Sequence, residues 1–115
     1  MPEFGNPFSG NDCCRKLTKE ELIRAIRFSI TAEYEAVQFY IQIADATDDQ
    51  LVINVMEHIA EGEIIHAGEF LRLLEELSPE EAVLYAEGAK KVEAEMKKLV
   101  TDPENDDDSP LFILD

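Results

Sequence analysis

Apolar positions recur at helical spacing along two long segments of the chain, and a few polar residues interrupt each series. The first series is Ile26, Ile30, Glu33, Val37, Tyr40 and Ala44. The second series is Val52, Met56, Ile59, Glu63, His66, Phe70, Leu73 and Leu77. Both series advance by alternating steps of three and four residues, which is the spacing of a helix face that packs in a bundle. The pattern therefore predicts two long helices, over about 19–45 and about 48–77.

Capping signals mark where these two helices should begin. Thr18-x-x-Glu21 and Thr47-x-x-Gln50 both have the capping-box pattern, in which two side chains satisfy free backbone N–H groups at the start of a helix. Only two or three residues then separate the helices. The sequence therefore predicts an antiparallel hairpin.

A third, shorter amphipathic helix is predicted over about 79–100, because Ser78 before a proline combines an N-cap with a favoured first helical residue. The predicted fold class is all-α: an antiparallel two-helix hairpin plus this shorter third helix. We expect the helical domain to span 18–100. It follows an N-terminal segment, 1–17, predicted to be disordered, and precedes an acidic flexible linker with a short apolar C-terminal peptide, 101–115.

Two glutamates and a histidine occupy positions where a helical core should be apolar. Glu33 lies in the first series, and Glu63 and His66 lie in the second with i, i+3 spacing. A buried carboxylate is costly unless it is paired or metal-bound. In a hairpin that turns near residue 48, Glu33 and Glu63 are equally far from the turn, and His66 is about one helical turn further. The three side chains are therefore predicted to meet in one site.

This set is half of the ligand set of a di-iron carboxylate four-helix bundle. Such bundles use a glutamate from each of two helices and a Glu-x-x-His pair from each of two others. A two-fold dimer of this hairpin would form such a bundle and supply the whole set. Carboxylate oxygen and imidazole nitrogen suit iron, so the predicted cofactor is a di-iron centre, with calcium or zinc able to occupy the same groups in vitro. The alternative is a buried polar cluster without metal.

Three further residues each have two interpretations. Tyr40 lies two turns from Glu33 on the same series, so it is either a core aromatic or a hydrogen-bonding partner of a ligand or of a bound oxygen species. His58 lies off the second series, so it is either a surface or interface histidine or a metal ligand. Glu35 belongs either to a solvated acidic face or to a path that gathers cations.

Composition narrows the function classes. The 115 residues carry a formal net charge of −16, which disfavours nucleic acid and anionic membranes as partners and suits a protein that attracts cations. No apolar run has the length of a membrane span, and no secretory signal is visible. The two cysteines, Cys13 and Cys14, are adjacent, and we expect a reducing, intracellular compartment; the role of this pair stays open. The short chain allows only a thin core, so oligomerisation is expected.

Two segments carry a resemblance to a known family. Residues 32–40 (AEYEAVQFY) and residues 61–67 (EGEIIHA) resemble the core segments of the encapsulated ferritin-like proteins. These are half-length relatives of ferritin that dimerise into the bundle and reside inside encapsulin nanocompartments. In that family the glutamate of the first segment and the Glu-x-x-His of the second are the ferroxidase ligands. The resemblance places these ligands at Glu33, Glu63 and His66.

The likeness extends over about 18–100 and includes departures from the family pattern. Family members often carry further acids beside the first glutamate, where they help iron to reach the site. Glu35 matches one of these acids, whereas Ala32 occupies a position that is often acidic. The family's secondary metal sites near His58 look altered, because Gly62 and Ile65 stand where acids could help.

The resemblance also implies partners. It implies a homodimer, a ring-like decamer of dimers with extra metal sites where dimers meet, and a cytoplasmic location inside an encapsulin shell. Family members carry C-terminal peptides that dock on the shell interior, and residues 109–115, held on an acidic linker, look like such a peptide. A truncated fusion junction, as in archaeal relatives joined to the shell protein, and an unrelated tail are the alternatives.

The predicted function is therefore that of an enzyme, a ferroxidase that passes electrons from Fe(II) to O₂ or peroxide and feeds iron storage inside the nanocompartment. Two alternatives from other classes stay open. One is a rubrerythrin-like protein that reduces peroxide, which a rubredoxin-type four-cysteine module would favour; the sequence contains none. The other is a non-enzymatic cargo or scaffold with a vestigial site, which the complete ligand motif argues against.

Overall fold

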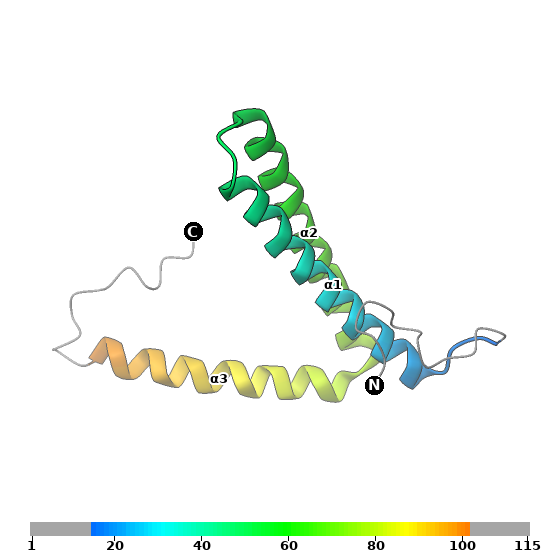
Figure 1. Cartoon of the computed structure of the whole chain (residues 1–115). Helices are drawn as coiled ribbons and strands as arrows, with labels where there is room; N and C mark the ends of the chain where they lie inside the picture. Colours follow the sequence, from blue (N-terminus) through cyan, green and yellow to red (C-terminus); the bar gives the residue numbers. More distant parts are fainter. Residues whose placement is uncertain (1–14, 102–115) are drawn as a thin grey trace. The chain divides into compact units, whose positions relative to one another are not determined.

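The structure is a computed structural model, and it describes residues 15–101. It contains the helices α1 (Lys19–Asp45), α2 (Gln50–Leu77) and α3 (Pro79–Thr101) (Figure 1). No strand occurs in the part of the chain that the structure describes. The all-α prediction is therefore confirmed, with helix ends within about two residues of those expected.

α1 begins with a complete capping box, as predicted. Thr18 Oγ1 accepts a hydrogen bond from the backbone N–H of Glu21 at 3.2 Å, and Glu21 Oε1 accepts one from the backbone N–H of Thr18 at 2.8 Å. The Arg15 guanidinium donates to both carboxylate oxygens of Glu21, each at 2.7 Å. The Arg15 hydrogen bond first, and the Thr18 N–H second, lower the pKa of Glu21 to about 2. The cap therefore stays charged well into the acidic range.

α2 begins at Gln50, and its cap differs from the prediction. The Asp49 carboxylate accepts hydrogen bonds from the backbone N–H groups of Leu51 at 3.0 Å and Val52 at 3.3 Å. The Thr47 hydroxyl instead accepts a hydrogen bond from the backbone N–H of Asp49 at 3.1 Å. The predicted Thr47–Gln50 capping box is therefore wrong. Asp49 stands directly before the helix, and a carboxylate there is among the best N-caps.

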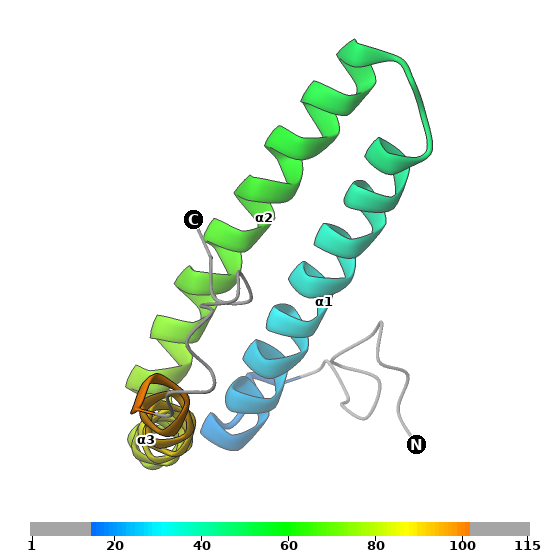
Figure 2. The ribbon, with the colours of Figure 1, turned by 90° about the vertical axis from the view of Figure 1, so that its left-hand side faces the viewer.

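α1 and α2 lie side by side and antiparallel, as the short connection predicted (Figure 2). The buried residues of α1 are Ala25, Ile30, Val37 and Ala44. Three of these four belong to the predicted apolar series, which confirms the inward face of α1. Burial of these apolar side chains between α1 and α2 stabilises the two helices, although the chain is strongly acidic.

The inward face of α2 is rotated by about one residue from the prediction. The buried residues of α2 are Ala60, Ala67 and Leu74. Each of them directly follows a predicted inward residue that is exposed instead, namely Ile59, His66 and Leu73. A helix that packs against a single neighbour buries only a narrow strip, whereas the apolar face in the sequence is wider. The remainder of that face lies uncovered along one edge of the hairpin.

α3 belongs to a second compact unit, which begins at Glu80, and is described by itself. The backbone N–H of Ser78 closes α2 by donating to the Leu74 carbonyl at 2.8 Å, and Pro79 is the first residue of α3, as predicted. None of the described helices combines the length and the apolarity that a bilayer crossing requires. Most of the predicted terminal segments lies outside the described residues.

Candidate metal centre

The hairpin brings the three predicted ligands together. Glu33 lies near the middle of α1, and Glu63 and His66 lie about one turn apart on α2. Buried apolar residues precede and follow each glutamate by one turn: Ile30 and Val37 in α1, and Ala60 and Ala67 in α2. Packing of the apolar seam thus fixes the register between the helices and, with it, the height of the ligands. The equal distance from the turn predicted this register.

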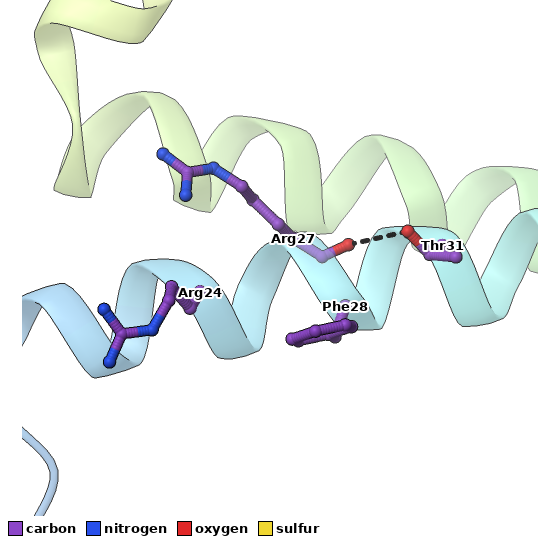
Figure 3. Close-up of a pocket in the computed structure, with 4 residues that line it drawn as sticks. All are labelled: Arg24, Arg27, Phe28 and Thr31. Atoms are coloured by element: carbon purple, nitrogen blue, oxygen red, sulfur yellow. Dashed lines mark hydrogen bonds between the residues drawn. The ribbon is translucent and has the colours of Figure 1, made fainter. Parts of the chain in front are cut away.

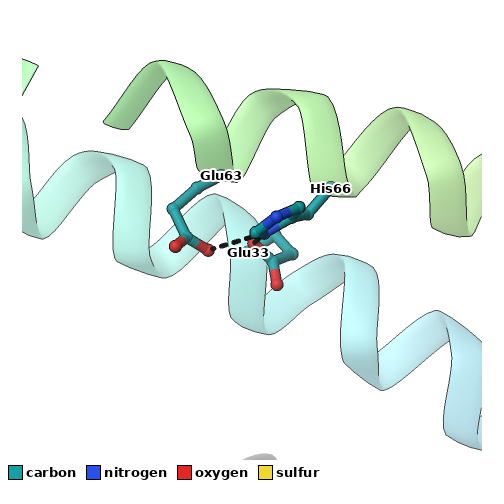
Figure 4. Close-up of side chains that lie close together, drawn as sticks. All are labelled: Glu33, Glu63 and His66. Carbon is teal, nitrogen blue, oxygen red and sulfur yellow. Dashed lines mark ion pairs between the residues drawn. The ribbon is translucent and has the colours of Figure 1, made fainter. Parts of the chain in front are cut away.

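All three side chains converge on one point (Figure 4). His66 Nδ1 lies 3.6 Å from Glu33 Oε2 and 3.8 Å from Glu63 Oε2. One ligand atom of each residue lies within 4.8 Å of the other two. Separations of roughly 3–4 Å are those of neighbouring ligand atoms around an ion bound at about 2 Å. The geometry therefore suits a single cation held by both helices.

Burial within this group is uneven. The exposed fractions of the side chains are 17% for Glu33, 21% for Glu63 and 55% for His66. Glu33 Oε2 is buried and has no hydrogen-bond partner. A buried acceptor without a donor costs free energy unless a proton or a cation satisfies it. The donor set therefore fits a metal ion. The sequence pattern predicted His66 in the core of the hairpin, whereas the structure places it at the exposed edge.

The pKa of Glu33 is raised above its ordinary value. The first cause is a hydrogen bond with the Glu63 carboxyl, followed by burial and by the negative charge of Glu63, while His66 opposes the shift. When Glu33 is ionised, its buried Oε2 has no donor to satisfy it. This environment therefore favours the protonated form of Glu33 until a cation replaces the proton.

Glu33→Gln is expected to raise the Tm of the metal-free protein by more at pH 8 than at pH 5. Because folding raises the pKa of Glu33 above the usual 4.5, ionisation costs stability in the folded state only. This cost is absent well below that value, grows as pH rises towards the folded-state pKa, and persists above it. Glutamine cannot ionise and escapes the cost.

Thermal unfolding in the presence of EDTA, followed by circular dichroism, measures this difference. Glu35→Gln is the matched control, since Glu35 lies in the same helix two residues away and is exposed. An equal change in Tm for both variants at both pH values would contradict the raised pKa of Glu33.

The other three candidate residues lie apart from this group. Tyr40 is half-buried, and its ring centroid lies 5.8 Å from that of Phe39. Glu35 and His58 are both exposed. In residues 15–101, the group of at least three acids, histidines or cysteines close enough to hold one ion consists of Glu33, Glu63 and His66 alone.

A separate hollow of about 290 Å³, which sequence analysis did not single out, lies on α1 (Figure 3). It is lined by Arg24, Arg27, Phe28 and Thr31. The Thr31 hydroxyl donates a hydrogen bond to the Arg27 carbonyl at 3.2 Å. Two guanidinium groups repel a cation, so this hollow is not an alternative metal site.

Comparison with known proteins agrees with this arrangement of helices. Residues 25–106 match the family model described as Rubrerythrin. The crystal structure of the encapsulated ferritin domain from Pyrococcus furiosus superposes with a TM-score of 0.69 and 34% identity, covering 74% of this chain and 85% of that one.

Two curated proteins are similar in sequence. The encapsulin nanocompartment cargo protein EncC of Myxococcus xanthus is 38% identical over 91 residues, which cover 79% of this chain and 68% of that protein. A ferritin-like–encapsulin shell fusion protein of Pyrococcus furiosus is 37% identical over 75 residues. That match covers 65% of this chain but only 22% of the fusion protein, so it concerns a minor part of that longer protein.

Proposed function

The chain belongs to the rubrerythrin/ferritin-like family, and on that basis we propose that it is a ferroxidase that oxidises Fe²⁺ to Fe³⁺ at a di-iron site. The observation that carries the proposal is the convergence of Glu33, Glu63 and His66, with a buried carboxylate oxygen that lacks a partner. Carboxylate oxygens with one imidazole per ion form a donor set suited to iron.

A second copy of the chain completes the site in this proposal. One hairpin offers two carboxylates and one imidazole, whereas a ferritin-like di-iron site uses four and two. Ile59, Gly62, His66 and Leu73 share one face of α2 by their i, i+3, i+4 spacing. On this face Ile59 and Leu73 remain 37% and 44% exposed, and a Cβ at Gly62 would meet nothing within 4 Å. An apolar edge beside the ligands supports docking of a partner hairpin there.

Each ligand then has a definite task. Glu33 from each copy bridges the two ions, and Glu63 and His66 of each copy hold one ion. The raised pKa of Glu33 favours its protonated form, and this proton must leave when Fe²⁺ binds, so binding weakens as pH falls. Fe²⁺ is the substrate: two Fe²⁺ ions lose one electron each, and O₂ takes both electrons and two protons to form hydrogen peroxide.

The compartment is also part of the proposal. One relative is named an encapsulin nanocompartment cargo protein, and another is a fusion to an encapsulin shell. We infer that this chain resides in the cytoplasm inside an encapsulin shell, with residues 109–115 as the docking peptide. Those residues lie outside the described part of the chain, so binding of the isolated peptide to the shell protein is the direct measurement.

Anaerobic titration with Fe²⁺, followed by exposure to air, tests the ferroxidase proposal. We expect saturation at two irons per dimer, and then a ferric absorbance band that grows far faster than in protein-free buffer. Hydrogen peroxide in place of air tests the rubrerythrin-like alternative, which the family match makes relevant. Oxidation no faster than in buffer with either oxidant would overturn the proposal and favour a non-enzymatic cargo. Binding of zinc or calcium without oxidation of iron would not support the ferroxidase proposal.

A further inference from the structure

We draw no further inference here: the strongest candidate, the hollow on α1 lined by Arg24, Arg27, Phe28 and Thr31, places two guanidinium groups beside an aromatic ring, but nothing in the structure shows what occupies it.

Discussion

His66→Ala is expected to lower the rate of Fe²⁺ oxidation by about 100-fold or more, because removal of groups that merely support a metal ligand already costs about 10- to 100-fold. His66 supplies the imidazole of the group, and its Nδ1 lies within 4 Å of both carboxylates. Its side chain is 55% exposed, so alanine leaves no cavity in the core. The loss should therefore appear in activity while helicity and Tm stay close to those of the parent.

Stopped-flow absorbance of the ferric product, after mixing anaerobic Fe²⁺-loaded protein with air-saturated buffer, measures this effect. His58→Ala is the matched control, because the chain has two histidines and His58 is exposed in the same helix. Glu63→Gln and Glu61→Gln form a second matched pair, with one member in the site and one exposed. Parent-like rates for His66→Ala, or a comparable loss for His58→Ala, would show that the site is wrongly assigned.

Leu74→Ala is expected to lower the free energy of unfolding by about 3 kcal/mol, as is usual when a fully buried leucine is truncated and a cavity remains. Leu74 is 1% exposed, the lowest value among the buried core residues described. In a domain of this size the change corresponds to a fall in Tm of roughly 15 °C. The hairpin should open first at the C-terminal end of α2, because the buried Leu74 side chain holds that end against α1.

Urea titration at a fixed protein concentration with EDTA measures the change without the contribution of bound metal. Leu51→Ala is the matched control: the same substitution in the same helix, at a residue that is 72% exposed. Its effect should stay within about 0.5 kcal/mol. A similar decrease in the free energy of unfolding for both variants would mean that burial of Leu74 does not stabilise the hairpin more than an exposed leucine does.

The register of the two long helices could be predicted because it is encoded locally. Thr18 and Glu21 sit at capping-box spacing, and the structure forms both hydrogen bonds. To predict that Glu33 and Glu63 lie at the same level, only the position and the length of the connection between the helices were needed. The constant rise per residue thus determines which side chains share a level, and it follows from the helical pattern of the sequence alone.

Two details could not be predicted for physical reasons. At the start of α2, Thr47 and Asp49 are both good capping residues, and the outcome depends on backbone angles in the turn that sequence does not specify. Along α2, the apolar series contains residues for more than one neighbour. Sequence cannot tell that Ala67 packs within the chain while His66 and Leu73 are left at its edge.

Two buried alanines of α2 set the separation of the helices at the metal centre. Ala60 and Ala67 are 4% and 2% exposed and lie one turn to either side of Glu63. A methyl group is the smallest side chain that can fill such a layer, so α1 and α2 approach closely at the level of Glu33. The gap between the opposing carboxylates is therefore set by the volume of residues that never touch an ion. A valine at either alanine would widen that gap and shift the preference of the site towards ions of larger radius.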